Sequence, residues 1–106
     1  MKKIAFFVLL AVSVFAFGAG YDSRREKAAR CFGKIRITAG DADFRVAPVS
    51  WNEDLGVRIV RDASDAVNPG RWHLVPSGAD FSVKLVPSNE FHHFSVRFVD
   101  SGEGVR

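Results

Sequence analysis

From Ile35 onward, apolar and polar residues alternate in short units that repeat about every eleven residues. Each unit reads apolar, polar, apolar, apolar, then a polar connection, then an Asp followed by an apolar residue. Short alternation is typical of a half-buried strand, and connections containing Gly, Pro and Ser are typical of turns. The pattern predicts six short strands joined by tight turns. The units start at Ile35, Val46, Val57, Trp72, Val83 and Val96.

An eleven-residue period also occurs in right-handed helical coiled coils, so that fold has to be considered. Prolines at Pro48, Pro76 and Pro87 interrupt any helix that it would need. The intervals that follow Val57 and Val83 are longer than the others, and they would rotate a helical stripe off its face. A unit this short cannot bury its apolar face alone, so the units must stack on one another. We therefore expect an all-β, single-domain fold built from six stacked strand-turn units.

An Asp followed by an apolar residue closes three of the connections, at Asp43-Phe44, Asp54-Leu55 and Asp80-Phe81. Such an Asp is expected to bond nearby backbone N–H groups, while the apolar residue docks inward. Three other connections keep the apolar residue with a weaker or absent Asp signal: Asp65-Ala66, His93-Phe94 and Gly104-Val105.

A short helix is predicted over Ser23–Phe32, ahead of the first unit. Ser23 with Glu26 fits a capping box, and Gly33 is placed to stop the helix. Its basic residues predict a solvated face rather than an anion-binding helix. They are Arg24, Arg25, Lys27 and Arg30.

Residues 1–20 have the organisation of a secretory signal peptide. A positive start, Met1-Lys2-Lys3, precedes the apolar stretch Ile4–Phe17 and the small residues Gly18-Ala19-Gly20. The apolar run is shorter than the roughly 20 residues that a bilayer span needs. We expect cleavage before Ala19 or after Gly20, a mature domain over residues 21–106, a periplasmic or secreted location, and no stable membrane insertion after cleavage.

Removal of the leader changes the charge of the protein. The 106-residue chain has 15 Lys and Arg against 12 Asp and Glu, a net charge of +3. Without Lys2 and Lys3 the mature part carries 13 against 12, a net charge of +1, which gives no case for nucleic-acid binding. Cys31 is the only cysteine, so an internal disulfide is excluded. Its apolar surroundings predict a buried residue; an intermolecular disulfide or a reactive thiol is the alternative.

The order of these features resembles the septoil knot family. The resemblance rests on the opening Gly33-Lys34-Ile35, the Asp-apolar turns, the stretch Asn68–Trp72 and the terminal stretch Val96–Ser101, and it covers the whole mature chain. Members are small exported bacterial proteins whose backbone forms a torus knot with seven crossings. The resemblance implies a knotted fold and carries no known activity or ligand. An unknotted small β-barrel or β-roll would show the same periodicity.

Residues with catalytic or metal-binding chemistry are sparse. The histidines are His73, His92 and His93, and the adjacent pair would point to opposite faces of a strand. Their spacing matches no standard zinc motif, and no nucleophile elbow or other catalytic motif surrounds the Ser, Asp and His residues. We therefore predict no catalytic, cofactor-binding or metal-binding residues, and a protein that is not an enzyme and needs no cofactor.

The second position of each unit is mostly basic and should face away from the core. A basic stripe would suit adhesion to anionic envelope polymers or lipid head groups. With a net charge of only +1, the pattern favours a solvated sheet face that is balanced by the turn aspartates. The positions are Arg36, Ala47, Arg58, His73, Lys84 and Arg97.

Two classes of function fit this sequence. The first is a non-catalytic envelope or secreted module, structural or binding, whose partner could be an envelope protein or an anionic polymer. The alternative is a binder or inhibitor of an exported enzyme. An exposed aromatic patch around Trp51 and Trp72 would favour partner binding, whereas a uniformly polar surface would favour a passive structural role. A deep pocket that gathers His with Asp would favour a hydrolytic enzyme.

Overall fold

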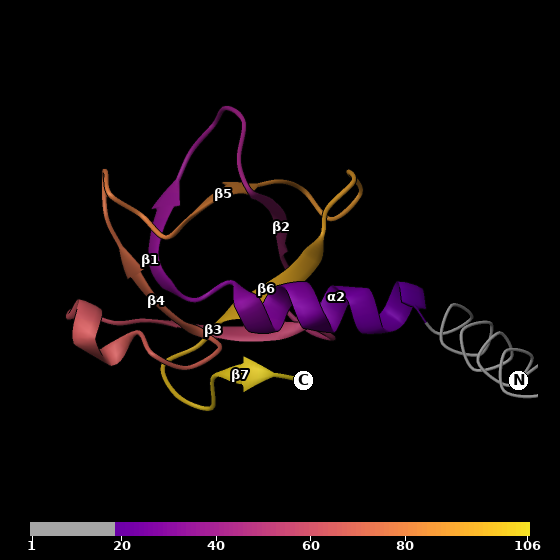
Figure 1. Ribbon diagram of the computed structural model, residues 1–106. Coiled ribbons are helices and arrows are strands. Elements are labelled where there is room, and N and C mark those ends of the chain that lie inside the picture. The colour runs from indigo at the N-terminus through magenta and orange to yellow at the C-terminus, as the bar shows by residue number, and fades with distance from the viewer. Residues whose placement is uncertain (1–18) are drawn as a thin grey trace, which may run out of the picture.

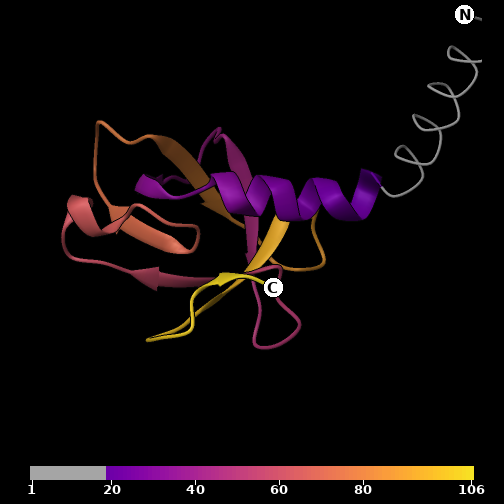
Figure 2. The same cartoon turned by 60° about the horizontal axis from the view of Figure 1, so that its bottom comes forward.

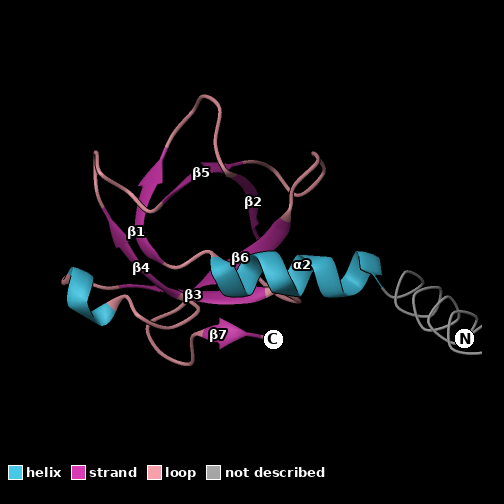
Figure 3. Ribbon diagram, in the orientation of Figure 1, coloured by secondary structure: helices cyan, strands magenta, loops and turns pink. Residues whose placement is uncertain are grey.

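The computed structural model describes residues 19–106, as one helix followed by short strands whose connecting loops project outward (Figure 3). The predicted leader therefore lies almost entirely outside the described residues. In chain order the elements are α2 (Ala19–Arg30), β1 (Gly33–Ile37), β2 (Phe44–Pro48), β3 (Leu55–Ile59), the 3-10 turn η1 (Ala63–Asp65), β4 (Arg71–Leu74), β5 (Phe81–Leu85), β6 (Phe94–Phe98) and β7 (Gly104–Val105).

Within the described chain, six strands form a closed ring in which every neighbouring pair is parallel. The order around the ring is β4-β1-β5-β2-β6-β3, and the pairing of β3 with β4 closes it. Closure leaves these strands without the free edges that invite aggregation. The short strand β7 pairs antiparallel with β3. The predicted all-β fold of stacked strand-turn units is confirmed.

The strand order shows that the chain runs around this ring twice (Figure 1). On the first circuit β1, β2 and β3 take alternate places, and on the second β4, β5 and β6 fill the gaps between them. Connections within a circuit have six to eight residues, whereas parallel strands usually need a dozen or more. The longer connection, residues 60–70, contains η1 and accounts for the long interval between the unit starts Val57 and Trp72. It lies where the first circuit passes into the second.

The middle layer of the barrel interior consists of the residues that start the predicted units. Each of these six side chains is 0% exposed: Ile35, Val46, Val57, Trp72, Val83 and Val96. The strands begin two residues before the unit starts, or one residue before in β4. Phe44, Leu55, Phe81 and Phe94, the apolar members of four of the predicted pairs, are therefore the first residues of strands, and side-chain alternation directs them inward, as predicted. Phe44, Leu55 and Phe94 are buried there, and Phe81 is partly buried.

The last inward-facing positions of the strands form an apolar rim at the carboxyl ends of the barrel strands. By side-chain alternation these positions share the inner face with the middle layer. Five rim residues are 40–45% exposed, and the sixth, Pro48, is also exposed. The Phe98 ring packs edge-on against Trp72 with centroids 6.1 Å apart, so the rim shields the middle layer. The rim comprises Ile37, Pro48, Ile59, Leu74, Leu85 and Phe98.

Helix α2 packs across β6 and β3 of the barrel and differs from the prediction at both of its ends. It runs over Ala19–Arg30 rather than Ser23–Phe32, so Ser23 lies inside the helix and the capping-box prediction is wrong. Ala28 and Cys31 are 0% exposed within the core, so packing rather than a local cap anchors the helix. Figure 2 shows α2 beside the C-terminal segment, and it contacts β3, β6 and β7. Within residues 19–106, no helix has the length and apolar character to cross a membrane.

Candidate binding site

Within the described chain, the same reciprocal clip fastens four of the six strand interfaces. The residue before one strand bonds the second residue of the neighbouring strand. Asp54 accepts hydrogen bonds from the Ser95 N–H (2.9 Å) and hydroxyl (3.1 Å), and the Asp54 N–H donates to Ser95 Oγ (3.0 Å). Asp43 and Ser82 repeat this pattern at 2.8–3.3 Å. The turn aspartates thus bond backbone N–H groups on strands that are distant in the sequence, rather than nearby ones as predicted.

The other two clips use one Asp and one His. The Asp80 carboxylate accepts from the Lys34 N–H at 3.0 Å, and the Asp80 N–H donates to the Lys34 carbonyl at 2.7 Å. In the last clip His93 Nδ1 accepts from the Arg45 N–H at 2.8 Å, and the His93 N–H donates to the Arg45 carbonyl at 2.7 Å. Nδ1 must be unprotonated to accept this bond. Burial, followed by the nearby charges of Lys27, Arg45 and His92, lowers the pKa of His93 below its ordinary value of 6.5.

This clip predicts a loss of stability in acid that an Asp at position 93 would relieve. A lowered pKa in the folded state means that the unfolded state binds more protons, so the stabilisation is present above pH 6.5 and is lost as the pH falls through and below that value. The His93→Asp variant supplies the acceptor used in the other clips, and a carboxylate stays ionised to about pH 4. Between about pH 7.5 and 5, we expect its unfolding free energy to fall by about 1 kcal/mol less than that of the parent.

Urea unfolding at a series of pH values measures this difference. His92→Asn is the matched control, because the neighbouring His92 ring forms hydrogen bonds only with Arg24 and the Glu90 carbonyl among the described residues and takes no part in a clip. It removes only the smallest of the effects that lower the pKa of His93, so it should keep most of the pH dependence of the parent. An unchanged pH dependence in His93→Asp would show that the clip does not depend on the protonation of the ring.

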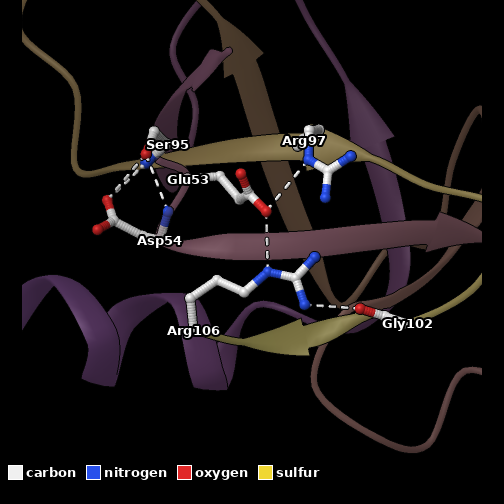
Figure 4. Close-up of polar contacts among 6 residues, drawn as sticks. All are labelled: Glu53, Asp54, Ser95, Arg97, Gly102 and Arg106. Atoms are coloured by element: carbon white, nitrogen blue, oxygen red, sulfur yellow. Dashed lines mark hydrogen bonds and ion pairs between the residues drawn. The ribbon is translucent and has the colours of Figure 1, made fainter. Parts of the chain in front are cut away.

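The connection between β2 and β3, residues 49–54, is held against β6 at both ends. The Val49 N–H donates to the Val96 carbonyl (2.8 Å), and the Asp54–Ser95 clip fixes the other end. Between them, Glu53 pairs with Arg97 at 3.2 Å and with Arg106 at 2.9 Å (Figure 4). A hydrogen bond from its own backbone, then those from Arg106 and Arg97, lower the pKa of Glu53. The loop is therefore a pinned platform.

Trp51 stands at the tip of this platform and is 76% exposed. The next residue, Asn52, turns the chain with a φ of 58°, a left-handed conformation that Asn tolerates better than most residues. An open groove of about 480 Å³ runs between this loop and the β5–β6 connection. Trp51 and Asn52 line one side, Ser88 and His92 line the other, and Ser95 of the clip lies between them.

Three of the polar side chains that line this groove are available to a ligand. Ser50, Asn52 and Ser88 line it, and their side chains form no hydrogen bond with the rest of the described chain. His92 is held in place, because its Nε2 accepts from Arg24 at 3.2 Å and its Nδ1 donates to the Glu90 carbonyl at 2.8 Å. None of the described lining residues is Lys, Arg, Asp or Glu.

The remaining reactive side chains lie apart from one another. His73 Nδ1 bonds the Val60 carbonyl at 3.1 Å, away from the other two histidines. Within residues 19–106, no three His, Cys, Asp or Glu side chains gather closely enough to hold a metal ion, and no Ser hydroxyl bonds a His ring. Cys31 is buried, as predicted; this burial, with a smaller effect of Asp43, raises the pKa of its thiol to about 12.

The predicted basic stripe is only partly present. Ala47 is buried, while Arg58 pairs with Glu103 (3.2 Å) and Arg97 pairs with Glu53. The partners of these two arginines are glutamates, whereas the carboxylates of the turn residues Asp43, Asp54 and Asp80 bond backbone N–H groups in the clips. Glu103 also accepts a hydrogen bond from Arg71, and this bond is the largest of the effects that lower the pKa of Glu103 to about 2. Among the described residues, Arg36 and Lys84 make no ion pair.

The two tryptophans named in the sequence analysis have opposite environments. Trp51 is exposed beside the groove, whereas Trp72 is 0% exposed in the middle layer and contributes nothing to the surface. The sequence reasoning did not single out Phe91, which is 70% exposed on the β5–β6 connection. Phe91 packs against His93 with ring centroids 5.3 Å apart and does not line the groove.

Comparison with known proteins supports the resemblance noted in the sequence. The family model of the 7(1) septoil knot domain matches residues 28–106, which include all of the described strands. A comparison with curated proteins found no match.

Proposed function

Since the chain belongs to the septoil knot family, whose fold is knotted, we propose that it is a non-catalytic exported module of the bacterial envelope that binds a partner through the groove beside Trp51. The observation that carries this proposal is the 76% exposed indole, held at the tip of a loop whose two ends are pinned to β6. Exposed Trp residues are enriched where proteins bind partners. The ion pairs of Glu53 and the clip of Asp54 fix the loop that carries Trp51, so the indole is presented on a surface that is already ordered.

The location outside the cytoplasm is supported by the organisation of residues 1–20, with its positive start, apolar stretch and small residues. A non-catalytic role is supported by the contacts of the groove. Ser95 is committed to Asp54, and His92 is committed to Arg24 and the Glu90 carbonyl. In the described chain these contacts leave no nucleophile paired with a general base.

The alternative of a binder for anionic envelope polymers has less support. Such a polymer would need a continuous basic surface, and glutamates neutralise the arginines at two of the six stripe positions. Inhibition of an exported enzyme remains compatible with the groove, because a protein partner could also take Trp51. Enzyme inhibition would use the same groove, with the exported enzyme as the partner.

The proposal predicts that Trp51→Ala removes envelope binding without affecting the fold. Purified exported protein would be co-sedimented with isolated bacterial envelopes, and the bound fraction would be measured over a range of protein concentrations. We expect the variant to lose at least about tenfold in apparent affinity, because a central exposed Trp is a typical hot spot. Its unfolding free energy should stay within about 0.5 kcal/mol of the parent, because the side chain is at the surface.

Phe91→Ala is the matched control, because Phe91 is similarly exposed but lies outside the groove. It should bind envelopes like the parent. Equal retention of Trp51→Ala and the parent would contradict a binding role for this groove. Equal losses in both variants would indicate nonspecific adhesion by exposed aromatic residues.

A further inference from the structure

We propose that the ligand of the Trp51 groove is a neutral glycan chain, in which the face of one sugar ring lies on the Trp51 indole and its hydroxyls bond the groove walls. This inference rests on the proposed binding function and adds the chemical class of the ligand. A pyranose ring has an apolar C–H face and a polar edge, so it needs a flat apolar surface next to uncharged donors and acceptors.

The apolar surface is supplied by Trp51. Its indole is the most exposed of the large apolar side chains in the described chain. The flat ring offers an amphipathic contact area and loses little side-chain entropy when it is covered. The loop that carries it is pinned by Asp54 and Glu53, so a ligand would not have to order the platform on binding.

The polar edge of a sugar would meet Ser50, Asn52 and Ser88, whose side chains are not used within the described chain. A hydroxyl both donates and accepts, and an amide has two donors and an acceptor oxygen, so these groups suit sugar hydroxyls in either role. The groove volume of about 480 Å³ lies within the usual range for small-ligand sites, about 300–1,000 Å³. It can hold a short stretch of a chain, and its open form leaves room for the chain to continue.

The charge of the groove argues against anionic ligands. None of the described lining residues is Lys or Arg, and both nitrogens of His92 are already bonded. A second groove, of about 390 Å³, lies beside the equivalent Asp43–Ser82 clip and shows the contrast. It is lined by Arg36 and Asp43, and Phe81, its aromatic lining residue, is partly buried. Of these two grooves, the one beside Trp51 therefore combines an exposed aromatic platform with walls free of Lys, Arg, Asp and Glu.

Tryptophan fluorescence can follow sugar binding at this groove. The chain has two tryptophans, and Trp72 is 0% exposed, so a ligand on the surface would change the emission of Trp51. The exported protein would be titrated with neutral β-1,4-linked oligosaccharides, tetra-N-acetylchitotetraose and cellotetraose, and followed by tryptophan fluorescence and calorimetry. We expect saturable binding by at least one of them, with a Kd on the order of 0.1–1 mM for so open a site. The emission of Trp51 should shift as the sugar covers it.

The Kd of three variants, and the Kd of the parent at two salt concentrations, then show whether the sugar binds in the Trp51 groove. Trp51→Ala should weaken binding measured by calorimetry at least about tenfold, and Phe91→Ala should leave it unchanged. Asn52→Gly keeps a residue that tolerates the positive φ but removes the amide, and it should weaken binding about threefold to tenfold. Raising the salt from about 0.05 to 0.5 M should change the Kd less than about twofold, because no charge pair forms.

Each other result overturns the glycan assignment. If neither oligosaccharide binds while Trp51→Ala still loses envelope retention, the groove takes a different ligand, such as a protein, and the proposed function stands without the glycan. Binding that is insensitive to Trp51→Ala would place the sugar elsewhere on the surface and overturn the assignment to this groove. Loss of both envelope retention and sugar binding in Phe91→Ala as well would show that the groove is not the site.

Discussion

Trp72→Ala is expected to lower the unfolding free energy by about 3–5 kcal/mol, the cost of truncating a fully buried aromatic side chain. Trp72 is the largest of the fully buried side chains in the described chain, and its indole N–H donates to the buried Cys31 carbonyl at 2.7 Å. The variant therefore opens a cavity in the middle layer and leaves that carbonyl without its partner. Because domains of this size are stabilised by only about 4–13 kcal/mol, a large fraction of the molecules should be unfolded near 37 °C.

Urea unfolding followed by circular dichroism measures this cost, with Trp51→Ala as the matched control. The two variants carry the same substitution in the same chain and differ in the burial of the residue. Trp72→Phe separates the two contributions: it keeps most of the packing but removes the donor, and it should cost about 1–3 kcal/mol. A loss below about 1 kcal/mol in Trp72→Ala would contradict the packed middle layer.

Periodicity was sufficient to predict the core of this protein. Every unit start read from the sequence is a middle-layer residue, because a side chain that recurs at the same point of each strand meets its equivalents inside the ring. The period also predicts which of the two tryptophans is buried. Trp72 is a unit start and is buried, whereas Trp51 lies in a connection, off the period, and is exposed.

Contacts between strands could not be read from the periodicity, because it does not say which units become neighbours. The clip between Asp54 and Ser95 joins the end of the β2–β3 connection to strand β6, which is far away in the sequence, and the pairing of Glu53 with Arg97 of β6 depends on the same neighbourhood. The groove arises where the β2–β3 connection passes close to the β5–β6 connection, so its walls are adjacent only in the folded ring. The predicted helix start was wrong as well, because α2 already begins at Ala19 and Ser23 lies inside it.

The interleaved circuits have a consequence for folding. On the second circuit, β5 has to enter between β1 and β2, and β6 between β2 and β3. In the knotted fold of the septoil knot family, a chain end must also be threaded through loops before the ring can close, which departs from the usual rule that chains do not thread. Threading adds a kinetic barrier beyond the one expected from the contacts. Folded domains fused at both termini should slow threading strongly, and folding with it, because neither chain end can then pass through a loop.

The most direct test of the knotted, interleaved ring is the folding rate of newly synthesised chains, which start untied, with a stable domain fused at the N-terminus, the C-terminus, both or neither. Folding would be followed as the gain of protease resistance after cell-free translation, under reducing conditions because Cys31 is exposed until the chain folds. We expect double fusion to slow folding at least about tenfold relative to either single fusion, a barrier increase of about 1.4 kcal/mol or more, while the final protease resistance stays the same. Equal folding rates for the double-fused and unfused chains would contradict threading and leave an unknotted barrel with the same core.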